Sequence, residues 1–307
     1  MSFVGLVVVL TLAGGALALF HASPGGRRST AERYARTVDL DLGELRGVVE
    51  RRLARREVAG AVGGVLGAWV TVGGLVAAGL PGSWVAALAA IGFLAGAAVA
   101  YAVVAWRDSG GPLADGPRIA RATAPGHGDY VARHERWGAW AAAGAATLVA
   151  VGLAAVDAAG VLDLGEVPLG LAAATAVLPW VAVGLDAAVA RRLLDRPQVA
   201  TSTHELAWDD ALRARTLRDL VGVVITVAVV MPVMLASVVA EGLPGGWPEN
   251  PAVGVVMGLI AAILGAAGVM TVVSLALQPG RHVRTRLWPA SPPRPGLGQL
   301  AGAGGAR

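Results

Sequence analysis

The amino-acid sequence predicts an all-α fold: a polytopic integral membrane protein with seven transmembrane helices, its N-terminus outside and its C-terminus in the cytoplasm. Of the 307 residues, 55% are hydrophobic and 15% are charged, a balance too apolar for a soluble domain of this length. Seven apolar runs are each long enough to cross the hydrocarbon core of a bilayer. The arginines are confined to the connections on one side of these runs. These three observations define the predicted fold class and topology.

The predicted spans form a single transmembrane domain over residues 1–277. They lie at about residues 3–20, 58–80, 84–106, 138–156, 168–189, 220–240 and 252–277. No basic residue precedes the first run, which favours a retained helix, because a cleaved secretory signal begins with a basic region. The tail at 278–307 is rich in proline and glycine, and we expect it to be a disordered cytoplasmic segment.

Charge decides the predicted orientation. All 25 basic residues are arginine, and they occur in four segments, at 27–57, 107–137, 190–218 and 278–307. The alternating connections, at 81–83, 157–167 and 241–251, carry no basic residue. Because arginine-rich loops beside membrane spans are retained in the cytoplasm, the topology is N-out and C-in. The abundance of Ala, Gly and Arg is typical of a GC-rich bacterial genome, so we expect a multi-pass protein of the bacterial cytoplasmic (inner) membrane.

Cap patterns predict short helices within the arginine-rich connections. Ser29-x-x-Glu32, Asp41-x-x-Glu44 and Ser202-x-x-Glu205 have the spacing at which side chains cap a helix N-terminus. The helix expected at 44–57 is amphipathic, and its arginines form a possible docking or lipid-binding surface. They are Arg46, Arg51, Arg52, Arg55 and Arg56. The expected partners are a bilayer with an anionic inner leaflet and a cytosolic or membrane protein. A solvated helix that only sets the topology is the simpler alternative.

Glycines predict how the second and third spans pack. The second span contains two overlapping G-x-x-x-G patterns, and the third contains one, Gly92-x-x-x-Gly96. Such faces let two helix backbones approach closely in lipid. Since only residues 81–83 connect these spans, we predict packing within the chain rather than a dimer interface.

Two residue types are absent, and this excludes several kinds of chemistry. Without cysteine the chain has no disulfide, thiol nucleophile, iron–sulfur cluster or thiolate zinc site. Without lysine it has no retinal or pyridoxal Schiff base and no P-loop lysine. We therefore expect no cofactor. The net charge of +4, distributed over membrane loops, does not indicate nucleic-acid binding.

The segment 127–135 holds the strongest cluster of ligand-type side chains. His127, Asp129 and His134 are weak candidates for a metal site, because imidazole and carboxylate groups suit zinc. On one helix the two histidines would be about 10 Å apart along the axis, too far to share an ion. We therefore predict solvated loop residues rather than a metal site, and we assign no catalytic residue.

The sequence suggests three classes of function without defining an activity. No charged side chain lies near the centre of a predicted span, which argues against a proton-coupled pump. The leading hypothesis is a non-enzymatic scaffold or membrane partner subunit with basic cytoplasmic docking helices. The first alternative is a small-molecule permease, in which Pro179 and Pro232 kink the fifth and sixth helices. The second is a lipid-modifying membrane enzyme acting through the 107–137 loop, which is the less favoured because no site supports it.

Overall fold

The structure, a computed structural model, contains helices and no strand in the part of the chain that it describes. The described residues are 3–77, 85–108, 124–160, 169–196, 198, 200–243, 251–276 and 280–288. The long helices are α1 (Phe3–Ala22), α3 (Arg46–Ala77), α4 (Val85–Asp108), α6 (Arg133–Ala158), α7 (Leu169–Leu194), α8 (Thr203–Gly242) and α10 (Pro251–Ala276). The shorter helices are α2 (Pro24–Val38), α5 (His127–Tyr130) and α11 (Gly280–Leu287). The all-α prediction is confirmed for these residues.

Several helices have the length and composition of membrane spans. Five of them, α3, α4, α6, α7 and α8, are long and apolar enough to cross a membrane, and the number is six if the bent pair α1–α2 forms one span. Large apolar side chains such as Leu66, Val70 and Leu148 are exposed on the outside of these helices. Extensive apolar exposure of this kind suits a lipid environment. The described part of each of the seven predicted apolar runs lies on a helix, and seven membrane crossings stay a prediction.

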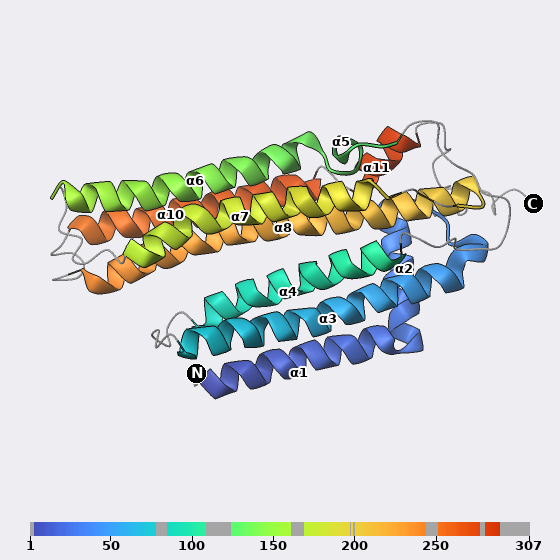
Figure 1. Ribbon diagram of the computed structural model, residues 1–307, viewed down its shortest axis with the longest axis horizontal. Coiled ribbons are helices and arrows are strands. Elements are labelled where there is room, and N and C mark those ends of the chain that lie inside the picture. Colours follow the sequence, from blue (N-terminus) through green and yellow to red (C-terminus); the bar gives the residue numbers. More distant parts are fainter. Residues whose placement is uncertain are drawn as a thin grey trace, which may run out of the picture.

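The long helices form two groups (Figure 1). α1, α3 and α4 lie side by side in the first group, and α6, α7, α8 and α10 make up the second. The groups contact each other through α4, which packs against α8 and to a lesser extent against α7, and through side chains of α3 that meet α8. α2, α5, α11 and the first turns of α8 gather at one end of the molecule, on the right in Figure 1.

Glycine contacts hold α3 and α4 together. A Cβ atom added to Gly67 would lie 2.1 Å from the carbonyl oxygen of Gly92, and one added to Gly96 would lie 2.1 Å from that of Gly63. Only a residue without a side chain permits such an approach of two backbones. The prediction that these glycines pack the helices within one chain is confirmed.

Small side chains have a similar role in the second group. α6 contributes Ala139, Ala143, Ala146 and Ala150, which follow each other at helical spacing and are all buried. The first two pack with α7 and α8 in one core cluster, and Ala150 belongs to a second cluster with Leu235 of α8. Because alanine adds little bulk, α6 comes close to both neighbours.

The chain turns sharply between α1 and α2, which are bent by 84° relative to each other. Ser23 caps α2 by accepting a hydrogen bond from the Gly26 N–H at 3.1 Å. The predicted helix start at Ser29 is therefore wrong, because Ser23 provides the cap and Pro24 is well placed in a first turn. The helix predicted at 44–57 begins with a 3-10 turn at Gly43–Leu45 and continues without a break into the second span as α3.

The first part of the predicted C-terminal tail is helical. α11 packs against α2, α5 and α8, and its Val283 is 5% exposed. Arg284 of α11 pairs with Asp39, the left-handed residue that ends α2. These contacts place 280–288 against other helices, while residues 289–307 lie outside the described part of the chain, and the disorder of the tail stays a prediction.

Candidate functional site

Oppositely charged side chains of α3 and α8 form a cluster that we call the charged junction. Its members are Arg52, Arg56, Glu57, Asp209, Arg213, Arg215 and Asp219. Arg56 pairs with Asp219, and Nη1 of Arg52 lies 3.6 Å from a carboxylate oxygen of Asp209. These groups lie close together because the arginine-rich first turns of α3 run beside the polar first half of α8.

The burial of its arginines indicates that the charged junction has a structural role. Only 5% of the side chains of Arg56 and Arg213 is exposed. The Arg56 guanidinium lies over the Tyr101 ring of α4, with 4.0 Å between its Cζ and the ring centroid. Arg213 donates to the carbonyl oxygens of Leu193 at 3.4 Å and Arg196 at 3.1 Å, at the end of α7. Because a buried charge without partners costs several kcal/mol, these arginines hold the four helices together rather than await a ligand.

A buried carboxylate next to Asp209 in the sequence joins α5 and the segments before α8 and after α11 to α8. Asp210 is fully buried and accepts hydrogen bonds from three donors. They are the Tyr130 hydroxyl at 2.9 Å, the Gln198 amide at 2.7 Å and the Trp288 indole N–H at 3.0 Å. Three donors satisfy a carboxylate well, so Asp210 has a structural role in fastening α5 and the segment after α11.

The five arginines of the predicted docking surface fall into two sets. Arg46, Arg51 and Arg55 are exposed on α3. Arg52 and Arg56 belong to the charged junction, where 14% and 5% of their side chains are exposed, so little of either is available to a partner. An amphipathic pattern distinguishes polar from apolar positions but does not show which polar positions meet acids of another helix. The docking role of the exposed set stays a prediction.

Further exposed arginines lie on α2. Arg33 and Arg36 are exposed, and in the described part of the chain neither has an ion-pair partner, as is also true of Arg51 on α3. The opposite face of α2 is buried through Ala31 and Ala35 against α3 and α8. The i,i+3 spacing of Arg33 and Arg36 places them on one face of a helix, but the sequence does not show that this face is the exposed one.

The weak metal candidates are not assembled as a metal site. Asp129 pairs with Arg286 of α11 at 3.0 Å and accepts the Gly126 N–H at 2.9 Å. Burial raises the pKa of Asp129, but these two partners outweigh it, so the pKa lies below its ordinary value. His127 belongs to α5 and His134 to α6. Among the residues that the structure describes, no group of three or more His, Asp or Glu side chains is placed to hold a metal ion.

The two prolines of the permease hypothesis lie inside continuous helices. Pro179 is within α7 and Pro232 within α8, and neither helix is broken there. Near Pro179, Thr147 of α6 donates a hydrogen bond to the carbonyl oxygen of Ala176 at 3.1 Å and accepts one from the Trp180 indole at 2.9 Å. These bonds join α6 to α7 in a region where a proline leaves backbone groups without their usual partners. The kinks themselves stay a prediction.

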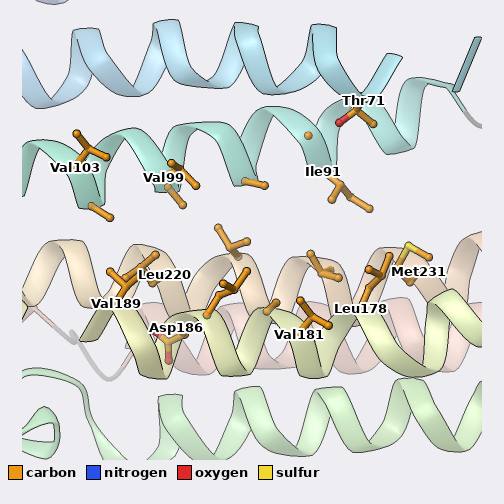
Figure 2. Close-up of a pocket in the computed structure, with 18 of the residues that line it drawn as sticks. Thr71, Ile91, Val99, Val103, Leu178, Val181, Asp186, Val189, Leu220 and Met231 are labelled. Carbon is orange, nitrogen blue, oxygen red and sulfur yellow. The ribbon is translucent and has the colours of Figure 1, made fainter. Parts of the chain in front are cut away.

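A cavity of about 630 Å³ separates α4 from α7 and α8 (Figure 2). Its walls are almost entirely apolar, with Ile91, Val99 and Val103 on α4 and Val181 on α7 among the residues that line it. Asp186 also borders the cavity, but Figure 2 shows its carboxylate pointing away from α4. The cavity is therefore suited to an apolar group and not to ion coordination.

Comparison of the chain with protein-family models, with curated proteins and with solved structures finds no match.

Proposed function

We propose that the chain is a non-enzymatic membrane component, a scaffold or partner subunit, that binds a cytosolic protein through exposed arginines at its basic end. In this proposal it is a seven-span protein of the bacterial cytoplasmic membrane, with its N-terminus outside and its C-terminus inside. The arrangement of the helices supports the orientation, because α2, α5, α11 and the start of α8 gather at one end (Figure 1). That end carries the arginine-rich segments, as the positive-inside rule requires of a cytoplasmic face.

The observation that carries the proposal is that some arginines are neutralised within the chain, while others are exposed and have no acidic partner in the described residues. The buried ones, such as Arg56 and Arg213, are neutralised within the chain. Arg33, Arg36 and Arg51, which we call the free basic face, are exposed and have no acidic partner in the described residues. Exposed positive charge without an internal partner attracts an acidic surface and speeds its association.

One observation favours the permease alternative. The apolar cavity lies where the two groups of helices meet, the usual place for a transported molecule. Neither Pro179 nor Pro232 is among its lining residues, so the predicted moving parts do not border it. We therefore rank this function second, and we rank a lipid-modifying enzyme third.

Purification in mild detergent from the native membrane tests the proposal. A cytosolic protein in stoichiometric amount should accompany the full-length chain. The variant R33Q/R36Q/R51Q should retain less than about a tenth of it, because each removed arginine weakens attraction to an acidic surface. The matched control R133Q/R191Q, which removes two exposed arginines of α6 and α7, should retain it.

Three results would contradict parts of the proposal. Retention of the partner by the free-basic-face variant would exclude that surface. Transport of a substrate by the purified chain alone in liposomes would instead establish the permease. A reporter fused to the C-terminus should be active only in a cytoplasmic assay, and an external signal would reverse the orientation.

A further inference from the structure

The cavity between α4 and α7 is open at its side. Val99, Val181 and Leu185 border it and are also exposed on the outside of the molecule, Val99 to 63% and Leu185 to 61%. All three lie within predicted spans, so the opening faces the hydrocarbon of the bilayer. Water is scarce at that depth, and lipid chains are the apolar groups available to fill the space.

One end of the cavity is basic and aromatic. Arg192 of α7 and Trp106 of α4 both line it there. Arg196 lies over the Trp106 ring, with 4.2 Å from its Cζ to the ring centroid, and donates a hydrogen bond to the Trp106 carbonyl oxygen. A tryptophan at the end of a span is typical of the membrane interface, and an arginine beside it suits a phosphate group.

The cavity is long enough to hold an acyl chain of one leaflet. Its lining runs along α7 from Leu178 to Arg192 and along α4 from Leu88 to Trp106, which is about 21 Å and about 27 Å of helix at 1.5 Å per residue. Half of the hydrocarbon core is about 15 Å thick. A chain inside the cavity would therefore begin at the interface, beside the arginines, and reach the middle of the bilayer.

We propose that this cavity binds one anionic phospholipid of the cytoplasmic leaflet, with an acyl chain between α4 and α7 and the phosphate beside Arg192 and Arg196. The lipid fills the space between the two groups of helices and joins them on the membrane side of the charged junction. This inference is independent of the proposed docking function, because it uses different residues and a different surface.

The absence of cysteine makes a direct test possible. In the variant V99C, the cysteine at the cavity opening is labelled with a fluorophore in the full-length chain. The chain is reconstituted in vesicles of phosphatidylcholine that contain increasing amounts of brominated phosphatidylglycerol, which quenches the fluorophore on contact. The variant L148C, labelled in the same way, reports ordinary boundary lipid, because Leu148 of α6 is 75% exposed and does not line the cavity.

The Val99 reporter should show about a 25-fold preference for brominated phosphatidylglycerol over brominated phosphatidylcholine, because two arginines near the leaflet contribute about fivefold each. The Leu148 reporter should show little preference. R192Q should reduce the preference about fivefold, since each arginine near the leaflet contributes about that factor. R192K should retain most of it, and R191Q should retain all of it because Arg191 does not line the cavity. Filling the cavity with A102F should weaken quenching at Val99 alone.

Three results would overturn the inference. Equal lipid preference at Val99 and Leu148 would show that the cavity holds no selected lipid. A preference that R192Q leaves unchanged would remove the phosphate site. Equal quenching by a brominated alkane, which has no charged head, would show a site for an apolar chain only. Binding of a cytosolic partner should be unaffected by R192Q, so failure of this inference is distinguishable from failure of the proposed function.

Discussion

Arg56 of α3 pairs with Asp219 of α8, 163 positions further along the chain, and the same guanidinium lies over the ring of Tyr101 on α4. Three helices thus converge on one buried side chain. Asp219 remains 38% exposed, so the pair is enclosed on the arginine side and open on the acid side. This ion pair connects the first helix group to the second. Substitution of either partner therefore measures how much the charged junction contributes to stability.

Replacing Arg56 with glutamine should destabilise the protein. Removal of one partner from a buried ion pair costs about 3–5 kcal/mol, and the partial exposure of Asp219 reduces the expected loss to about 2–4 kcal/mol. Equilibrium unfolding in mixed detergent micelles, followed by circular dichroism, measures it. R55Q is the matched control, because Arg55 is 62% exposed and its pair with Asp108 contributes about 0–1 kcal/mol.

A double-mutant cycle separates the pair from other effects of the substitution. If the two groups interact, R56Q/D219N should lose less stability than the two single changes added together. Additive losses would mean that Arg56 acts only through Tyr101 and Glu57.

The contact of α3 with α4 should tolerate no side chain at Gly67. In G67A the new Cβ would lie 2.1 Å from the backbone oxygen of Gly92, so the helices must move apart at a cost of about 1–3 kcal/mol. G73A, on the same helix, introduces a Cβ with no neighbour within 4 Å and should be neutral or stabilise the helix by up to about 1 kcal/mol. Thermal aggregation followed by size-exclusion chromatography compares the two variants, and equal midpoints would contradict the close packing.

Thr147 should contribute to the α6–α7 contact beyond its volume. T147V keeps the shape but removes the acceptor of the Trp180 indole and the donor to Ala176, and a loss of about 0.6–2 kcal/mol is expected for such bonds in a membrane. T226V is the control, because Thr226 bonds to Gly222 of its own helix. The emission of Trp180, isolated by replacing the other tryptophans with phenylalanine, should shift in T147V and not in T226V.

Acid should weaken the region around α5. Burial lowers the pKa of His127 from its ordinary 6.5, and the nearby Arg136 lowers it further. Below about pH 6.5 the unfolded chain therefore binds more protons at this site than the folded one, and stability falls as the pH decreases towards the folded pKa. Unfolding midpoints at pH 7.5 and pH 5.5 should differ less in H127Q than in the natural chain. H134Q, a change at an exposed histidine, should keep the full difference.

Local patterns predicted the parts of this protein that depend on neighbouring residues in the chain. The Ser202 cap is confirmed, since its hydroxyl accepts the Glu205 N–H at 3.1 Å, although the Glu205 carboxylate bonds to Thr201. The glycines of α3 and α4 are a second success. A three-residue connection forces two adjacent spans to pack as an antiparallel hairpin. Their glycine-rich faces therefore meet.

The candidate site was less predictable because its partners are distant in sequence. Nothing near Arg52 and Arg56 indicates that Asp209 and Asp219 of α8 will neutralise them, and an exposed basic helix has the same pattern. α11 was missed for the same reason. Its packing depends on Val283 meeting α8 and on Arg284 meeting Asp39, and these partners are distant in sequence.

The sequence by itself determined that the chain is helical, that several helices are apolar enough for a membrane, and that its arginines occupy alternate connections. These are properties of composition and spacing, and they depend on how each segment interacts with water and lipid rather than on contacts between helices. Only the tertiary structure decided which arginines are buried, which remain free, and that a space is left between α4 and α7. Those outcomes depend on how helices from opposite ends of the chain pack against one another, and that is a property of pairs of surfaces rather than of any single segment.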